Sequence, residues 1–336
     1  MPKTKITSLD VAAKAGVSQS AVSRVFSGAS ASKSTIKKVR DAADALGYRP
    51  NVLARSLITG QSKIIGLVVA YLDNQFYPDA LERLSNALQE QGYHILIFMA
   101  SGQSTDVERV VGELLDYQVD GIITASVGMS DELTKRCEAA GIPVVLFNRG
   151  QQDSRLSQET SDNRAGARKI ADFLVAGGHA RIAHISGWSG SSTGRERQAG
   201  FIAALAAFDL EPVAVADGKF KRDVAAQAAL EMVTAAKPDA IFAGNDHMAF
   251  AVIDALRHTA GMRIPEDISI IGYDDVPMAA WPSYDLTTMR QPSGQMVTAT
   301  VDTLLAQIAD RNVAPLKTAI DGPLVVRGSA RKPKDM

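Results

Sequence analysis

A cluster of polar side chains near the start of the chain has the chemistry needed to contact DNA. Its members share the outward face of one predicted helix: Gln19, Ser20, Ser23 and Arg24. A glutamine amide can form two hydrogen bonds with adenine, and a serine hydroxyl can hydrogen-bond to several different bases. Arginine binds phosphates or base edges. The pattern predicts a surface for double-stranded DNA, in which Arg24 mainly sets affinity while Gln19 and Ser20 set sequence choice. These two residues do not by themselves define a base sequence.

Two short helices are needed to position this surface. One face of the first is apolar at helical spacing: Leu9, Val11, Ala12 and Ala15. Thr7 can cap this helix, with Asp10 three residues later as an approximate capping box. Gly16 suits the left-handed position at its end, and Ser18 can cap the second helix. Two helices joined by a short glycine-containing turn form a helix-turn-helix, whose second helix fits the major groove; an ordinary helical hairpin is the alternative.

The distribution of charge favours the DNA-binding interpretation. Residues 1–60 carry ten Lys or Arg against three acids, a net of +7. The remaining residues carry 26 basic against 34 acidic side chains, a net of −8. A basic head on an acidic body is typical of a protein whose head binds a polyanion.

The segment after the head predicts a hinge. Ser32 can cap a third helix from Lys33 to Leu46, which ends before Gly47. Pro50 stops that helix, and a short fourth one can follow from Asn51 to Ile58. Two helical turns without a core are unstable alone. We therefore expect this helix to form only with a partner chain and DNA.

From Lys63 onward, apolar strands alternate with amphipathic helices. The first strands are expected at Ile64–Ala70, Tyr93–Met99, Gly121–Ala125 and Pro143–Phe147, with helices between them at Tyr77–Gln91, Thr105–Tyr117 and Ser130–Ala140. A second series is expected at Arg181–Ser186, Pro212–Val215, Asp239–Ala243 and Ile268–Gly272. Buried strands separated by crossover helices indicate doubly wound parallel sheets. Two series predict two lobes, with a ligand cleft beyond the carboxyl ends of their strands.

Composition restricts where such a protein works. At 336 residues and 46% hydrophobic, the chain can bury a large core in two or three domains. No apolar run reaches the length of a membrane span, and no signal-peptide pattern precedes the head. The single cysteine, Cys137, is expected on a helix as a packing residue, which suits a reducing compartment. We expect a cytoplasmic protein with no membrane partner.

Catalytic motifs are weak in this sequence. Residues 190–194 fit the G-x-S-x-G pattern of hydrolases, but that pattern needs a tight strand-to-helix turn, and several loop residues are expected here. No histidine follows Asp274, which therefore cannot complete a Ser–Asp–His order. The two histidines in a helical pattern, His247 and His258, suit core or surface roles. Without a dinucleotide, Walker or metal-ligand motif, we expect no enzyme activity, no cofactor and no metal.

Taken together, these segments resemble the lactose-repressor (LacI/GalR) family of bacterial transcription regulators. The resemblance covers nearly the whole chain, with the head matching over residues 10–25 and the hinge over residues 47–57. The body matches in Gly178-His179, Arg197-Gln198-Ala199-Gly200-Phe201, Asn245-Asp246 and Ile271-Gly272-Tyr273-Asp274-Asp275. Asn148-Arg149 departs from the family pattern, in which an Asp-Arg pair is common, so the role of Asn148 is open.

The resemblance implies an all-α helix-turn-helix head plus a hinge helix, followed by two doubly wound α/β lobes like a type I periplasmic-binding-protein core. The head would span residues 1–49, the hinge and linker 50–62, the effector-binding and dimerisation core 63–330, and a tail 331–336. Within the core, the N-lobe would take about residues 63–160 and 290–318, and the C-lobe about 161–289 and 319–330.

The resemblance also implies two sets of site residues. The DNA-binding set is Thr7, Ser18, Gln19, Ser20, Ser23, Arg24, Asn51, Ala54, Arg55 and Leu57, with Leu57 as a minor-groove wedge. The effector-binding set is Phe76, Arg149, Ser192, Arg197, Phe220, Asn245, Asp246 and Asp274. In this pattern Phe220 stacks on the ligand and Phe76 lines the opposite wall.

These features predict a ligand-controlled regulator, expected to be a repressor. One head per chain favours a homodimer on a near-palindromic operator of roughly 14–20 base pairs. The end of the chain has no leucine heptads, so a dimer is expected rather than a tetramer. The effector is expected to be a sugar or sugar derivative, with a purine as the alternative. A transported-solute-binding protein fits less well, because such a protein has an export signal and no basic head.

Overall fold

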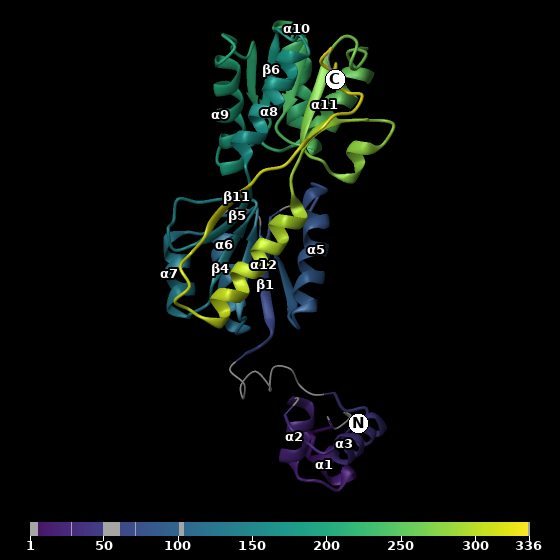
Figure 1. Ribbon diagram of the computed structural model, residues 1–336, viewed down its shortest axis with the longest axis vertical. Coiled ribbons are helices and arrows are strands. Elements are labelled where there is room, and N and C mark those ends of the chain that lie inside the picture. Colours follow the sequence, from purple (N-terminus) through teal and green to yellow (C-terminus); the bar gives the residue numbers. More distant parts are fainter. Residues whose placement is uncertain (1–5, 28, 50–60, 71, 101–103, 335–336) are drawn as a thin grey trace. The chain divides into compact units, whose positions relative to one another are not determined.

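The computed structural model describes residues 6–27, 29–49, 61–70, 72–100 and 104–334. The chain divides into two compact units, residues 1–63 and residues 64–336 (Figure 1). The predicted hinge helix, with its residues Asn51, Ala54, Arg55 and Leu57, lies outside the described residues.

The first unit contains a three-helix head: α1 (Ser8–Ala15), α2 (Gln19–Ser27) and α3 (Lys33–Leu46). The predicted caps are present, since the Asp10 carboxylate accepts a hydrogen bond of 2.8 Å from the Thr7 N–H, and Ser18 Oγ accepts one of 3.2 Å from the Ala21 N–H. Gly16 takes the left-handed conformation, with φ of 62°. The buried apolar core is Val11, Ala12, Val22, Val39, Ala42 and Ala43. The helix-turn-helix is confirmed.

The prediction that Leu9 belongs to the core of the head is wrong. The sequence pattern predicts Leu9 on the inner face of α1, but this residue is 60% exposed. At about 100° of rotation per residue, Leu9 lies about 160° away from Val11, which is fully buried. The inner face therefore follows Val11, Ala12 and Ala15 and excludes Leu9.

The second unit contains two lobes, and the N-lobe is built on a six-stranded parallel sheet in the order β11-β5-β4-β3-β1-β2. Its strands are β1 (Ile64–Val69), β2 (His94–Met99), β3 (Gly121–Ala125), β4 (Val144–Phe147), β5 (Ser157–Ser161) and β11 (Lys317–Ile320). The covering helices are α5 (Phe76–Glu90), α6 (Ser104–Asp116), α7 (Asp131–Ala139) and α12 (Ser293–Ala309). Continuous apolar runs such as Ile64–Val69 suit strands covered on both faces. Cys137 is buried on α7 as a packing residue.

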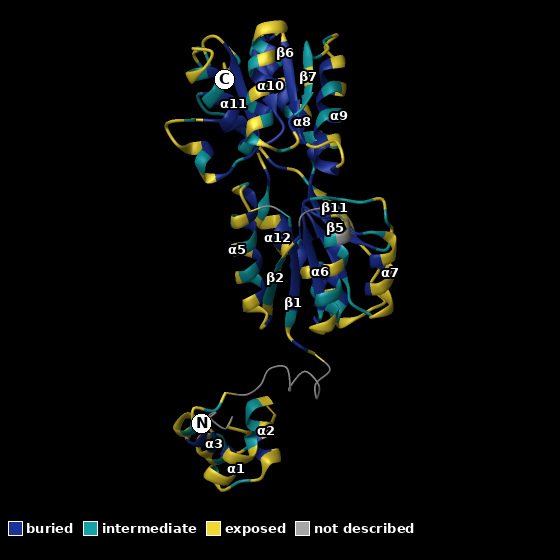
Figure 2. Cartoon of the chain, turned by 180° about the vertical axis from the view of Figure 1, so that it is seen from behind, coloured by how far each residue is buried: buried dark blue, intermediate teal, exposed yellow. Residues whose placement is uncertain are grey.

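The C-lobe repeats this plan with the sheet order β12-β10-β9-β8-β6-β7. Its strands are β6 (Ile182–Ser186), β7 (Ala214–Asp217), β8 (Ala240–Ala243), β9 (Ser269–Asp274), β10 (Thr287–Arg290) and β12 (Leu324–Val325). Its helices are α8 (Asn163–Ala176), α9 (Ser192–Ala206), α10 (Arg222–Ala235) and α11 (Asp246–His258), with a short 3₁₀ turn, η1 (Pro277–Ala280). Only β12 runs antiparallel to its neighbour among these pairings. Figure 2 shows buried residues gathered in the strands at the centre of each lobe.

The chain crosses between the lobes after β5, after β10 and after β11. These crossings bring the carboxyl ends of both sheets to the same boundary, which is where a ligand cleft is expected. The sequence pattern places one strand too early, at Pro212–Val215, whereas β7 runs from Ala214 to Asp217. The predicted tail begins at Arg331, yet the Arg331 N–H donates to Ser269 Oγ at 3.0 Å and fastens this residue to the C-lobe.

Candidate functional site

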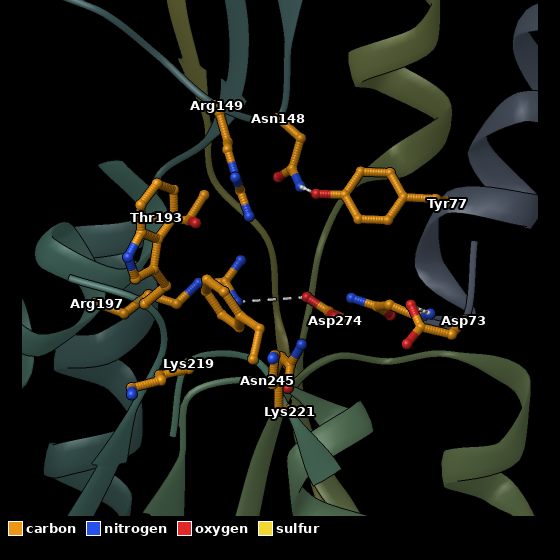
Figure 3. Close-up of a pocket in the computed structure, with 13 residues that line it drawn as sticks. Asp73, Tyr77, Asn148, Arg149, Thr193, Arg197, Lys219, Lys221, Asn245 and Asp274 are labelled. Carbon is orange, nitrogen blue, oxygen red and sulfur yellow. Dashed lines mark hydrogen bonds and ion pairs between the residues drawn. The ribbon is translucent and has the colours of Figure 1, made fainter. Parts of the chain in front are cut away.

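A cavity of about 720 Å³, counting its open mouth, lies between the two lobes (Figure 3). Its lining is Asp73, Asn74, Tyr77, Asn148 and Arg149 from the N-lobe, and Trp188, Thr193, Arg197, Lys219, Phe220, Lys221, Asn245 and Asp274 from the C-lobe. The lining combines aromatic rings with a few convergent polar groups, as is typical of small-molecule sites. The cavity is therefore a candidate effector site.

Arg197 is the fixed cation of the cavity. It lies on α9, is only 2% exposed, and its guanidinium packs 3.6 Å above the ring of Tyr273. Its Nε donates to Asn163 Oδ1 at 2.9 Å, and one terminal nitrogen donates to the Gly244 carbonyl at 2.7 Å. These contacts leave the guanidinium little freedom, so it presents its remaining donors to the cavity in one orientation.

Asp274 faces Arg197 from the end of β9. Its carboxylate lies 3.5 Å from the Arg197 guanidinium and accepts a hydrogen bond of 2.7 Å from Gln291 Nε2. Burial raises the pKa of Asp274 to about 6, against the opposing effects of Arg197 and of the Gln291 hydrogen bond. Its backbone φ of 131° is in the region that favours glycine. Such strain at a site is typical of a residue held in place for function.

The N-lobe wall carries hydrogen-bonding atoms that have no partner. Asn148 follows β4, with φ of 70°, and its amide nitrogen donates to the Tyr77 hydroxyl at 3.0 Å. Among the described residues, Asn148 Oδ1 and Arg149 Nε are buried without any hydrogen-bond partner. Since unpaired buried polar atoms are costly, these two atoms indicate a polar ligand or a bound water at this wall.

Direct contacts already join the lobes around the cavity. The Gly150 N–H donates to Ser192 Oγ at 3.0 Å, and the Arg149 guanidinium lies 5.6 Å from the centre of the Phe220 ring. Asp73 and His247 approach to 3.8 Å across the same boundary. A ligand in the cavity can add to these contacts.

The sequence-predicted effector residues divide into two groups. The first group lines the cavity: Arg149, Arg197, Phe220, Asn245 and Asp274. The second group does not: Phe76, Ser192 and Asp246. Phe76 packs in the N-lobe core, with its ring stacked 6.2 Å from that of Phe147, while the next residue, Tyr77, lines the cavity in its place.

Ser192 and Asp246 support the cavity from behind. Ser192 accepts the hydrogen bond from Gly150, and Asp246 is fully buried under the strained turn that follows β9. Asp246 accepts hydrogen bonds from the Val276 N–H at 3.0 Å and from the Thr288 hydroxyl at 2.5 Å. It fixes the turn that carries Asp274, so it is a positioning residue.

Sequence reasoning misses several lining residues. They are Asp73, Asn74, Tyr77, Trp188, Thr193, Lys219 and Lys221, and it leaves the role of Asn148 open. Lys219 and Lys221 flank the predicted Phe220, and Tyr77 and Thr193 each follow a predicted residue. The only signal in the sequence that could have found these four residues is that each lies next to a predicted one. Nothing in the sequence marks Trp188 or Asp73.

The head presents its predicted DNA-contacting side chains to solvent. All of the predicted DNA-contacting residues of the head are exposed: Thr7, Ser18, Gln19, Ser20, Ser23 and Arg24. Gln19 Nε2 donates to Ser8 Oγ at 3.0 Å, so α1 orients this side chain on the surface of α2. The exposed polar face of α2 has the composition expected of a recognition helix.

Comparison with known proteins adds family evidence to this geometry. Residues 7–51 match the model of bacterial regulatory proteins of the lacI family, and residues 171–330 match that of periplasmic binding protein-like domains. The chain is 33% identical to the HTH-type transcriptional regulator CelR of Thermobifida fusca, over 95% of this chain and 96% of that protein. It is 31% identical to the HTH-type transcriptional repressor PurR of Vibrio vulnificus, over 96% and 98%. These relatives are transcriptional regulators.

Two solved structures have the same fold. A CelR–cellobiose complex superposes with a TM-score of 0.74 at 31% identity, covering 97% of this chain and 100% of that one. A Lac repressor dimer bound to operator and the anti-inducer ONPF superposes with a TM-score of 0.88 at 28% identity, covering 97% and 99%. In the described part of this chain, no helix is long and apolar enough to cross a membrane.

Proposed function

Because the chain belongs to the lacI family of bacterial regulatory proteins, we propose that it is a ligand-responsive repressor that binds a near-palindromic operator as a homodimer. The observation that carries this proposal is the presence, in one chain, of an exposed polar recognition helix and a polar cavity between two lobes. The head supplies one half-site contact, and two heads related by a twofold axis suit a palindrome of roughly 14–20 base pairs.

The cavity chemistry favours a sugar or sugar derivative as effector. Arg197 and Asp274 offer a donor and an acceptor side by side, which suits vicinal hydroxyl groups, and Phe220 and Trp188 offer apolar ring faces. The similar CelR structure contains cellobiose. A purine is the alternative, since an aromatic platform with Asp and Arg also suits a nucleobase. Either effector controls DNA binding if its affinity differs between two lobe arrangements.

Selection from a randomised DNA library tests the operator proposal. The full chain should enrich a near-palindrome, Gln19→Ala should change the preferred bases, and Arg24→Ala should lower affinity for all sequences. Arg263→Ala, on the C-lobe surface, is the matched control because it removes an exposed cation from the other compact unit. If the parent chain shows no sequence preference at physiological salt, with or without metabolites, the DNA-binding proposal fails.

A thermal-shift panel of sugars, sugar acids, polyols and purines tests the effector site. A ligand that stabilises the parent should stabilise Arg197→Ala and Asp274→Ala much less. Arg195→Ala is the control, because Arg195 lies on the same helix but is exposed and outside the cavity lining. Thr193→Val gives a milder change if either buried variant fails to fold. A ligand that stabilises every variant as strongly as the parent binds elsewhere, which would remove the cavity from the proposal.

A further inference from the structure

The cavity has more positive than negative charge. Its lining contains four cations, Arg149, Arg197, Lys219 and Lys221, against two carboxylates, Asp73 and Asp274. Asp274 is already paired with Arg197. Asp73 is 74% exposed at its side chain and lies nearest to His247, so it contributes little charge to the interior.

The remaining cations have no carboxylate partner. Within the described part of the chain, no ion pair involves Arg149, Lys219 or Lys221. The Arg149 guanidinium donates to the Ser126 carbonyl, and its Nε is buried without an acceptor. Arg149 is half-buried, its Nε is fully buried, and no carboxylate among the described residues compensates its charge, so an anionic ligand at this wall would supply the missing negative charge.

The geometry brings two like charges together. Arg149 comes from the N-lobe and Arg197 from the C-lobe, and Figure 3 shows both side chains pointing into the same cavity. Arg197 is already paired with Asp274, whereas Arg149 has no carboxylate partner among the described residues. An anionic group that contacts both guanidinium groups would therefore balance the charge of Arg149 and connect the two lobes.

The neutral side chain of Asn148 fits the same conclusion. Asn148 lies next to Arg149 on the N-lobe wall. A carboxylate at this position would neutralise the charge of the Arg149 guanidinium, but the Asn148 amide cannot. We infer that the effector of this chain is an acidic sugar derivative, whose carboxylate or phosphate lies between Arg149 and Arg197 while Lys219 and Lys221 attract it at the mouth. This inference rests on the proposed effector site and narrows its ligand class.

Matched ligand series test the inference on the full chain by isothermal titration calorimetry. Each series contains a neutral aldose with its aldonate, its uronate and its 6-phosphate, in the gluco, galacto and manno configurations, with inorganic phosphate as a further probe. We expect the tightest binder to be an acid or a phosphate ester. Comparing the carboxylate members of a series with its phosphate member shows which of the two anionic groups the site prefers. Its affinity should fall as ionic strength rises.

Variants of the cavity residues test which side chains bind the anionic group of the ligand. Arg149→Gln and Asn148→Asp should each weaken binding of that ligand at least about tenfold, because each removes or neutralises the N-lobe cation. Lys219→Gln with Lys221→Gln should weaken it about threefold and reduce its salt dependence, as expected of exposed charges. Arg195→Gln is the control with unchanged affinity.

Three results would overturn the inference in distinguishable ways. If a neutral aldose binds tightest, with a dependence on Arg197, the cavity is an effector site and only the anionic ligand class is wrong. If no member of any series binds, or if binding survives in Arg197→Ala, the effector site itself is wrong and the inference falls with it. Inorganic phosphate binding as tightly as the best sugar derivative would also overturn it, because the site would then recognise a bare anion.

Discussion

Asp246 shows how one buried carboxylate can support a binding site without lining its cavity. It is the first residue of α11 and is fully buried. Its two hydrogen bonds hold Val276, in the turn after β9, and Thr288, on β10. Burial, and then the negative charge of Asp274, raise the pKa of Asp246 to about 8. Folding therefore favours the protonated form of Asp246 relative to the unfolded chain.

This raised pKa predicts a pH-dependent stability. A carboxyl whose pKa is higher in the folded state contributes most stability below its unfolded pKa of 3.8 and loses it as pH rises toward 8. The contribution of Asp246 to stability should therefore fall with rising pH in this window. The variant Asp246→Asn tests this origin, because its amide keeps an acceptor for the Val276 N–H and a donor for the Thr288 hydroxyl but cannot ionise.

Urea unfolding of the parent and of Asp246→Asn at several pH values between 4 and 8 measures this effect. The slope of stability against pH should become less negative in the variant, by up to about 1.4 kcal/mol per pH unit for one proton. Asp254→Asn is the control, because Asp254 is a partly exposed partner of Arg222. Identical slopes in the parent and Asp246→Asn would contradict the raised pKa.

Tyr77 is the residue that orients Asn148 in the cavity. Its hydroxyl accepts from the Asn148 amide nitrogen at 3.0 Å, while its ring packs edge-on against Phe76 at 5.4 Å. Tyr77→Phe keeps the ring packing and removes only the hydroxyl. Effector affinity should fall about 3- to 30-fold, the effect of one hydrogen bond in a buried site.

Calorimetric titration of the effector into Tyr77→Phe measures this loss. The matched control is Tyr284→Phe, because the Tyr284 hydroxyl contacts Asp254 and lies outside the cavity lining. Equal affinity in the parent and Tyr77→Phe would show that Asn148 needs no orientation by this hydroxyl.

At the scale of elements, much of the fold can be predicted because its signals are local. Helix caps at Thr7, Ser18 and Ser32 and the apolar runs of β1 and β3 each depend on a few neighbouring residues. Strand β5, whose sequence is Ser-Gln-Glu-Thr-Ser, carries no such signal, because its place in the sheet comes from β4 and β11 on either side.

The cavity is harder to predict because small shifts in an element change which side chain faces it. The sequence predicts a helix from Tyr77, with Phe76 before it in the cleft. The helix begins at Phe76 instead, so Phe76 turns into the core and Tyr77 faces the cavity. Left-handed residues such as Asn148 and Lys219 are set by tertiary contacts and have no sequence signal comparable to glycine.

A further prediction concerns the hinge segment, whose residues 51–58 lie outside the described residues. If residues 51–58 form a helix on the operator, with Leu57 as a wedge in the minor groove, Leu57→Ala should lower operator affinity at least about tenfold, since the wedge offsets the cost of unstacking a base step. Fluorescence anisotropy on the selected operator measures this. The effector-induced thermal shift should be unchanged, and loss of both properties, or of neither, would argue against a wedge.

For the whole molecule, we expect the edge of the N-lobe sheet to be the surface through which the proposed dimer forms. Strand β2 pairs only with β1 and ends the described sheet. Its side chains include two large apolar residues in solvent, Ile97 at 52% and Met99 at 47% exposure. An exposed apolar edge strand is an association surface unless it is covered. The proposed homodimer would place a second copy of the chain on this edge.

If this edge mediates association, light scattering on the purified chain should give about twice the 35.7 kDa chain mass. Ile97→Lys places a charge in the middle of β2 and should shift the mass toward the monomer. Operator affinity should fall with it, because a single head makes contact with only one half-site. Phe208→Lys is the matched control, since Phe208 is 45% exposed and follows α9 in the C-lobe. A tetramer mass for the parent, or a dimer that survives Ile97→Lys with full operator affinity, would place the association surface elsewhere.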